Sequence, residues 1–142
     1  MSKKQCAFCD IVAGRSPAHV IIENDCSMAI LDIYPFTKGH CLAIPKRHVI
    51  WWHEMTEEET ASLFSLARIV SVRLMKVFKP DFVGLYTRGR HVPHAHVHLV
   101  PTHSGDVLDT FFNTLEKYQY STEDLSRLKS PESMDAIARL LK

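Results

Sequence analysis

One long amphipathic helix, predicted between residues 56 and 80, limits what the chain can fold into. Thr56 followed by Glu59 matches a capping box, and Pro80 stops the helical pattern. Apolar residues recur between them at helical spacing, which gives the helix one apolar face. A helix of this kind among short strands is expected to pack on one face of a sheet. The apolar face consists of Leu63, Leu66, Ala67, Val70, Leu74, Val77 and Phe78.

Short segments rich in β-branched and apolar residues flank this helix on both sides. Asn24 and Asp25 separate the first two segments and indicate a hairpin. Short links between strands favour antiparallel pairing. The fold class is therefore α+β, an antiparallel sheet of about five strands with a long helix packed on one face. The expected strands cover residues 18–23, 27–33 and 40–45 before the helix, and 81–87 and 91–101 after it.

The chain is interpreted as one domain, residues 1–142, because this length is typical of a single domain. Weaker helical patterns fill a C-terminal extension from about residue 104 to 142, with a helix start at 121–125. Ile137, Leu140 and Leu141 of this tail are expected to pack on the body. Near the N-terminus, residues 9–14 predict a short helix that ends at a glycine.

Charge and hydropathy exclude some classes of partner. The chain has 17 basic and 16 acidic residues and a net charge of +1, which gives no general attraction to nucleic acid polymers or membranes. A small nucleotide needs only a local site. Residues 1–10 lack the apolar core of a signal peptide, and no apolar run approaches the ~20 residues needed to span a bilayer. We therefore expect a cytoplasmic protein without disulfides, in which the Cys6-x-x-Cys9 pair indicates metal binding or redox work.

The segment HVPHAHVHLVP, residues 91–101, contains four of the nine histidines. A strand sends successive side chains to opposite faces, so His94, His96 and His98 are expected on one face. Three ionisable rings in a row are costly on a core face, because burial disfavours imidazolium and leaves ring nitrogens without partners. The pattern therefore predicts a functional face that binds a metal, a phosphate-bearing ligand, or both.

The segment HAHVHLV, residues 94–100, fits the H-φ-H-φ-H-φ-φ signature of the histidine-triad (HIT) family, in which φ is an apolar residue. Residues 6–49 resemble the N-terminal half of the family, with LDIYP, GH and IPKRH in the family's order. The tail segment YSTEDLSRL is similar to bacterial-type members. The resemblance covers nearly the whole chain and implies a nucleotide-binding hydrolase or transferase, usually a homodimer.

The resemblance assigns chemistry to two of the histidines. The family's nucleophile is the middle histidine, which falls on His96, and imidazole has a pKa near ~6.5, so a neutral nitrogen is available at neutral pH. It can attack the α-phosphorus of an adenosine-type nucleotide and form a covalent nucleotidyl-histidine that water resolves. Dinucleoside polyphosphates and nucleoside phosphoramidates are the expected substrates. His98 can contact phosphate or help proton transfer to the leaving group.

The resemblance also implies the nucleoside contacts. Asp32, in LDIYP, falls at the family's ribose-binding acid, and its carboxylate can accept hydrogen bonds from both ribose hydroxyls. Four apolar residues are expected to form walls for the base, with a place in the ordinary core as the alternative. They are Phe8, Ile11, Leu31 and Ile33.

The segment before the triad departs from the family pattern. Family members have a Gly-Gln phosphate loop, whereas YTRGRHVPH, residues 86–94, is shorter and contains no Gln. Arg90 or His91 falls near the family's phosphate contacts and can replace them, because Arg binds phosphate well. The preceding strand, residues 81–87, offers no Asn. These departures keep an alternative open, a non-catalytic nucleotide-binding or adaptor protein of the same fold.

A metal site is the last feature that the resemblance implies. Zinc-containing members of the family use two cysteines and two histidines, a closed tetrahedral set that is structural rather than catalytic. An alternative places a catalytic metal on the three triad histidines, and the C-x-x-C pair argues against it by supplying a closed site elsewhere. The implied zinc ligands are Cys6, Cys9, His48 and His94.

The sequence gives three further residues no catalytic role. His40 follows Gly39 at the start of a predicted strand and is interpreted as structural. Lys46 and Arg47 are interpreted as a solvated pair, within possible reach of a phosphate.

Overall fold

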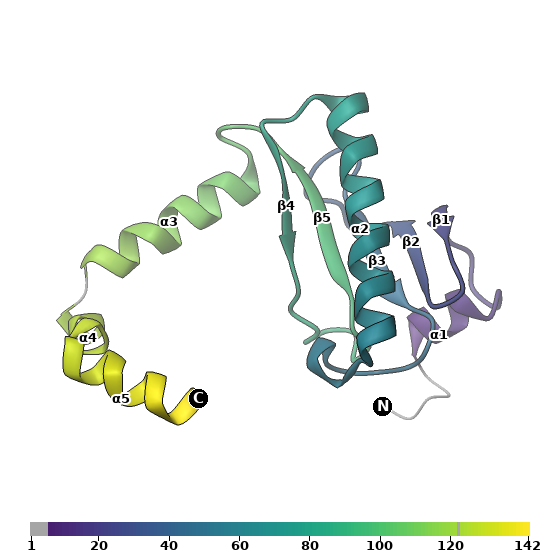
Figure 1. Ribbon diagram of the computed structural model, residues 1–142. Helices are drawn as coiled ribbons and strands as arrows, with labels where there is room; N and C mark the ends of the chain where they lie inside the picture. Colours follow the sequence, from purple (N-terminus) through teal and green to yellow (C-terminus); the bar gives the residue numbers. More distant parts are fainter. Residues whose placement is uncertain (1–5, 122) are drawn as a thin grey trace.

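The computed structural model describes residues 6–121 and 123–142. Five strands form one antiparallel sheet in the order β1-β2-β3-β5-β4, and helix α2 packs along it (Figure 1). The predicted α+β class is confirmed. The elements are α1 (Ala7–Val12), β1 (Val20–Glu23), β2 (Ser27–Leu31), β3 (Cys41–Pro45), η2 (Trp52–Glu54), α2 (Glu57–Phe78), β4 (Phe82–Tyr86), β5 (Val97–Thr102), α3 (Val107–Ser121), α4 (Glu123–Ser126), η3 (Arg127–Lys129) and α5 (Pro131–Leu141).

Helix α2 begins at the predicted capping box. The Thr56 hydroxyl accepts from the Glu59 backbone N–H at 3.2 Å, and the Glu59 carboxylate accepts from the Thr56 N–H at 2.9 Å. The same carboxylate binds the Arg47 guanidinium at 2.5 and 2.7 Å, and this hydrogen bond lowers the pKa of Glu59 to about 2. Arg47 is 49% exposed, as a solvated residue is, but its ion pair ties the end of the β3 segment to the start of the helix.

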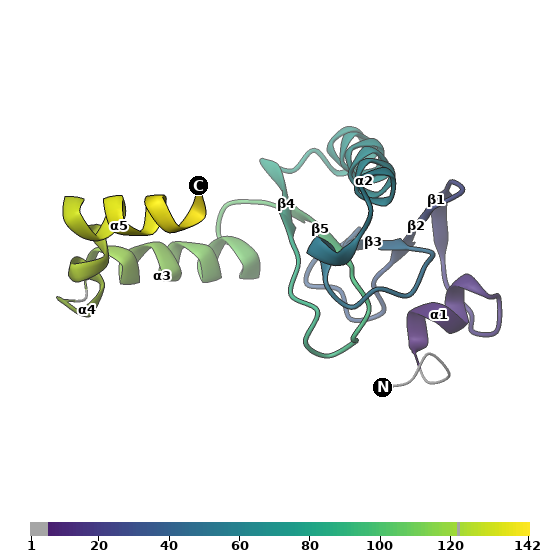
Figure 2. The same cartoon turned by 60° about the horizontal axis from the view of Figure 1, so that its bottom comes forward.

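The two faces of the sheet carry different partners. On one face, β2, β3 and β5 pack against α2 through Ala29, Ala43, Leu99 and their neighbours. On the other face, Ile30 joins Leu42, Ile44 and the N-terminal residues Cys6 and Phe8. Figure 2 shows α2 and α1 on opposite sides of the sheet. One face therefore builds the main core, and the other is available for a site.

Two helix predictions need correction. Val77 is 67% exposed, because the apolar face of α2 turns away from the sheet before the helix ends at Lys79, which adopts a left-handed φ of 49°. The N-terminal helix covers Ala7–Val12 rather than 9–14, since the chain already begins to turn after Cys6.

The fifth strand begins at Val97 and not at His91. Upstream of it the backbone bonds locally: the His94 N–H donates to the Val92 carbonyl at 2.8 Å, and the Ala95 N–H to the Val49 carbonyl at 2.6 Å. These residues are therefore outside the sheet ladder. Of the three triad histidines only His98 lies within the strand, with Val97 and Leu99 turned toward α2 as predicted.

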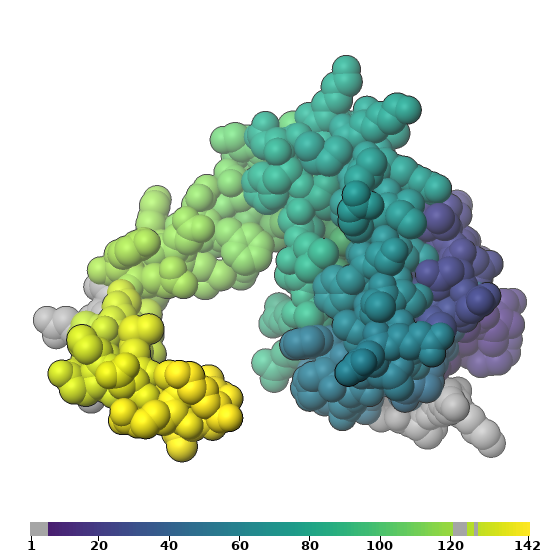
Figure 3. Space-filling view, in the orientation of Figure 1, coloured from purple at the N-terminus to yellow at the C-terminus, as the bar shows by residue number. Residues whose placement is uncertain are grey.

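The C-terminal helices form an arm that leaves the body. Leu108 is buried near Gly84 of β4, where the arm joins the sheet. Beyond that point α3 projects away, and α5 runs back beside it (Figures 1 and 2). Ile137, Leu140 and Leu141 are 54%, 81% and 83% exposed, so the expectation that they pack on the body is wrong. Figure 3 shows open space between the arm and the body. None of the described helices is long and apolar enough to cross a membrane.

The turn before β3 depends on a glycine, and this predicts a stability effect. Gly39 has a φ of +88°, and an added Cβ would overlap the Phe78 ring, 2.9 Å from Cδ2. Gly39→Ala is expected to lower the free energy of unfolding by about 3 kcal/mol or more, since backbone strain and overpacking add. Gly14 has a φ of +70° and nothing within 4 Å of its Cβ position, so Gly14→Ala should cost only about 1 kcal/mol of strain. Equal losses in denaturant titrations would show that the contact with Phe78 does not matter.

Candidate active site and metal centre

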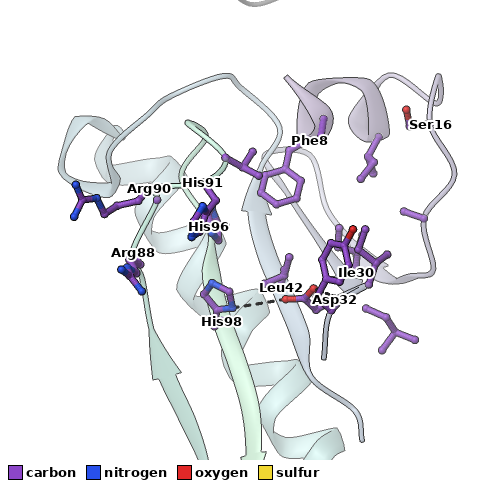
Figure 4. Close-up of a pocket in the computed structure, with 18 of the residues that line it drawn as sticks. Phe8, Ser16, Ile30, Asp32, Leu42, Arg88, Arg90, His91, His96 and His98 are labelled. Carbon is purple, nitrogen blue, oxygen red and sulfur yellow. Dashed lines mark hydrogen bonds and ion pairs between the residues drawn. The ribbon is translucent and has the colours of Figure 1, made fainter. Parts of the chain in front are cut away.

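A cavity of about 570 Å³ opens on the side of the sheet that faces α1, a size typical of small-molecule sites (Figure 4). Its walls come from α1, the end of β2 with the residues that follow, the end of β4, the 88–92 segment and the triad. All nine residues predicted to be catalytic or nucleotide-binding line this one cavity. They are Phe8, Ile11, Leu31, Asp32, Ile33, Arg90, His91, His96 and His98.

The hydrogen bonds of His96 fix which ring nitrogen is free. Its Nδ1 lies 2.6 Å from the carbonyl oxygen of His94, and a carbonyl can only accept. Nδ1 therefore carries the proton, and Nε2 keeps its lone pair. The ring is 8% exposed and packs edge-on against Phe8, with centroids 5.2 Å apart. In the neutral form of His96 the unprotonated nitrogen is therefore Nε2.

His98 has the opposite tautomer. The Phe36 backbone N–H donates to His40 Nδ1 at 3.2 Å, so the His40 proton is on Nε2. That nitrogen donates to His98 Nδ1 at 3.0 Å, which leaves the His98 proton on Nε2. The His98 ring stacks on Tyr86 at 4.5 Å. Burial, with smaller effects from His96 and His40, lowers the pKa of His98 to about 4, so the ring is neutral at pH 7.

Asp32 supplies the carboxylate of the cavity. Its Oδ1 accepts from the Tyr34 N–H at 2.8 Å, which orients the side chain at the end of β2. Its Oδ2 lies 3.5 Å from His40 Nε2 and 3.8 Å from His98 Nδ1. Figure 4 shows Asp32 on the wall opposite the arginines, with the histidine rings between them. The carboxylate therefore has acceptor capacity left for a ligand.

In the described part of the chain, two clusters have donor atoms close enough to hold a metal ion. Asp32, His40 and His98 lie within 4.8 Å of one another. The Phe36 N–H, however, requires the proton of neutral His40 to be on Nε2, the nitrogen that would have to bind the ion. This cluster is therefore better suited to hydrogen bonding than to metal binding.

The four predicted ligands form the other cluster, with donor atoms within 4.8 Å of one another. Sulfur-to-nitrogen distances are 3.2 Å from Cys9 to His48, 3.4 Å from Cys6 to His94 and 3.6 Å from Cys9 to His94. A tetrahedron with Zn–S of roughly 2.3 Å and Zn–N of roughly 2.0 Å has edges of about 3.5 Å. His94 Nε2 donates to the Pro45 carbonyl at 2.8 Å, which leaves Nδ1 bare and facing the sulfurs. The residues fit a zinc ion.

Comparison with known proteins identifies the family. A family model described as the HIT domain matches residues 13–105. This chain belongs to the HIT family. An adenosine 5'-monophosphoramidase of Schizosaccharomyces pombe is 38% identical over 101 residues, 68% of this chain and 73% of that protein.

Solved structures of HIT proteins share its fold. One from Bacillus subtilis superposes with a TM-score of 0.78 at 26% identity, covering 96% of this chain and 94% of that chain. A zinc-bound histidine triad family protein from Mycobacterium smegmatis has a TM-score of 0.68 at 27% identity, covering 82% and 99%. That zinc-bound structure agrees with the cluster of two cysteines and two histidines in this chain.

Sequence reasoning missed three residues of the site in this HIT protein, His40 behind the cavity and two residues in its lining. His40, interpreted as structural, is 1% exposed and fixes the tautomer of His98. The available signal in the sequence was a histidine directly before β3, the strand that pairs with β5. Tyr86 and Arg88 are in the lining itself. Tyr86 ends β4 and pairs with His98 of the antiparallel strand β5, and Arg88 follows shortly after it.

The metal centre predicts linked losses of metal and stability. Cys6→Ser is expected to lower bound zinc from about one ion per chain to well below that, and to reduce thermal stability, because a structural zinc contributes folding energy. Elemental analysis and thermal melting measure the two. Cys26→Ser is the matched control, since Cys26 is outside the cluster. Loss of metal in His96→Ala with retention in Cys6→Ser would contradict the assignment and favour a metal on the triad.

Proposed function

We propose that this HIT protein is a nucleotidyl hydrolase or transferase that acts on the α-phosphorus of adenosine-type nucleotides through a covalent intermediate on His96. One observation carries the proposal. The His96 Nδ1–H donates to the His94 carbonyl at 2.6 Å, which leaves an unprotonated Nε2 in a cavity lined by one carboxylate and two arginines. A neutral imidazole nitrogen held in one orientation is a competent nucleophile at neutral pH.

The reaction has two displacements at phosphorus. In the first, the Nε2 lone pair forms the N–P bond, and the bond to the leaving group breaks with its electron pair on the leaving group. The ring becomes positively charged, and its Nδ1–H bond to the carbonyl oxygen stabilises that charge. His98 donates its Nε2–H to a phosphoryl oxygen. In the second, water attacks the phosphorus and loses a proton to solvent, while the N–P bond breaks with its electron pair on Nε2, which returns His96 to its starting tautomer.

The nucleoside occupies the apolar side of the cavity. Phe8, Ile11 and Ile33 supply walls for the base, and the Asp32 carboxylate accepts from the ribose hydroxyls. Phe8 also contacts both His94 and His96, with ring centroids 5.7 and 5.2 Å apart. Phe8, the proposed wall for the base, therefore packs against both the proposed nucleophile His96 and the proposed metal ligand His94.

We propose that the Cys–His cluster holds a structural zinc. All four positions are filled by protein donors, so no position is left for substrate. The ion would tie α1, and with it Phe8, to the segment that carries His96. Such a centre needs reduced thiols, in keeping with the expected cytoplasmic location.

Removal of the nucleophile is the direct test of the enzyme. His96→Gly is expected to lower kcat/KM for adenosine nucleotides at least about 10³-fold, because the covalent step is lost. Wild-type protein quenched during turnover should carry an adenylyl group on His96, detected by mass spectrometry. His103→Ala is the control, an exposed histidine outside the cavity. Nucleotide binding without turnover across the substrate panel would instead establish the alternative, a binding or adaptor protein.

We also propose that the protein is a homodimer. β4 is an edge strand, and its residues Phe82 and Leu85, on opposite faces of the sheet, are 45% and 51% exposed. Phe111 and Leu115 of the arm are 56% and 45% exposed. An uncovered apolar edge of this kind favours pairing with a second copy. Sedimentation equilibrium should give twice the mass of the chain, and a monomer at tens of micromolar would contradict the proposal.

A further inference from the structure

We propose that Arg88 and Arg90 form a subsite for phosphate groups beyond the α-phosphate, so that the leaving group is a polyphosphate chain and not an amine. This inference rests on the nucleotidyl transfer at His96 proposed above and specifies its substrate class. The sequence indicated that Arg90 could replace a missing phosphate contact, and the second arginine emerges only from the fold.

Charge is divided between the two ends of the cavity. Among the described residues that line the cavity, Asp32 is the only carboxylate, and Arg88 and Arg90 are the only side chains with a permanent positive charge. Figure 4 shows both arginines on the opposite side of His96 and His98 from Asp32. A ligand that extends from Asp32 past His96 therefore reaches a positively charged end.

The arginines are held near the cavity by the residue between them. Gly89 is buried with a φ of +66°, and a Cβ on it would lie 3.4 Å from Trp51 Cζ3. The glycine is thus fixed against the indole, while the side chains on either side of it are exposed. This turn places the backbone of both arginines at the mouth of the cavity, and their exposed side chains extend from it.

Both guanidiniums are available to a ligand. Arg15 and Arg47 are ion-paired with Asp10 and Glu59. Within residues 6–121 and 123–142, by contrast, neither Arg88 nor Arg90 has an ion-pair partner. Two unpaired guanidiniums at one end of a cavity attract a group with more than one negative charge, and their planar donors suit phosphate oxygens.

The position of the nucleophile says which part of the substrate reaches this end. With the ribose at Asp32 and the α-phosphorus at His96, the remaining substituent on phosphorus extends toward the arginines. When the His96 Nε2–P bond forms, the bridging P–O bond breaks and its electron pair stays on the departing polyphosphate oxygen. The guanidiniums stabilise that charge, and the oxyanion needs no proton at neutral pH. Water then displaces His96 from phosphorus, releasing adenosine monophosphate and a proton to solvent.

An amine leaving group makes different demands. It must gain a proton as the P–N bond breaks, and it brings no negative charge to the arginines. His98, the histidine beside the reacting centre, is a neutral ring whose single proton is on Nε2, so it suits hydrogen bonding better than proton donation. The cavity is therefore better matched to a polyphosphate ester than to a phosphoramidate.

The test compares two substrates that share the adenylyl group. kcat/KM is measured for diadenosine tetraphosphate and for adenosine 5'-phosphoramidate with wild type, Arg88→Ala/Arg90→Ala and the control Arg68→Ala/Arg73→Ala. Arg68 and Arg73 are exposed on α2, outside the cavity, so the control removes the same charge. The ratio of kcat/KM for the tetraphosphate to that for the phosphoramidate should fall about 10- to 100-fold in the first variant only.

Each other result has a defined meaning. An unchanged ratio, whether both activities fall together or neither falls, would overturn the subsite. Wild type that turns over the phosphoramidate but not the tetraphosphate would also overturn it, while leaving the nucleotidyl transfer intact. If neither substrate yields an adenylyl group on His96, the proposed function itself fails.

Discussion

The hydrogen bond from His96 Nδ1 to the His94 carbonyl oxygen is the interaction on which the site depends. At 2.6 Å it sets the tautomer of His96 and turns Nε2 into the free nitrogen. The same His94 sends its ring into the Cys–His cluster and donates from Nε2 to Pro45. His94 therefore links the proposed zinc centre, through its ring, to the proposed nucleophile, through its carbonyl. A shift of the metal centre would move the carbonyl that orients His96.

One face of the sheet carries the main core, and the other face carries the cavity. Helix α2 and the alternate residues of β2, β3 and β5 build the main core on one face. On the opposite face, His98 and Leu42 are register partners on neighbouring strands, and α1 covers the ends. His98 thus lies on a strand whose other face is firmly packed, and His96 directly precedes that strand. This arrangement lets the loop at residues 87–92 differ from the family pattern without disturbing the core.

The sequence predicted most of the fold and the members of the site. The capping box of α2, its apolar face as far as Leu74 and the order of elements along the chain follow from local patterns, and these were confirmed. The histidine spacing brought the family into view, and the predicted contacts line one cavity. What local patterns could not show were the effects of distant partners. The start of β5 was wrong because Val49 and Val92 take the backbone bonds of the preceding residues.

The roles of His40 and Arg88 were missed for the same reason. His40 gains its importance from Phe36 on one side and His98 on the other, which only the folded chain brings together. The exposed tail residues Leu140 and Leu141 show the opposite case, in which an apolar pattern suggested a contact with the body that the fold does not make.

Histidine tautomers can be observed directly, and they test the central claim. Long-range nitrogen–proton correlation spectra of the zinc-loaded protein assign the protonated nitrogen of each ring. The account predicts Nε2–H for His94, Nδ1–H for His96 and Nε2–H for His98 at neutral pH. A proton on Nε2 of His96 in the free protein would contradict it, because the nitrogen assigned to attack phosphorus would have no lone pair to offer.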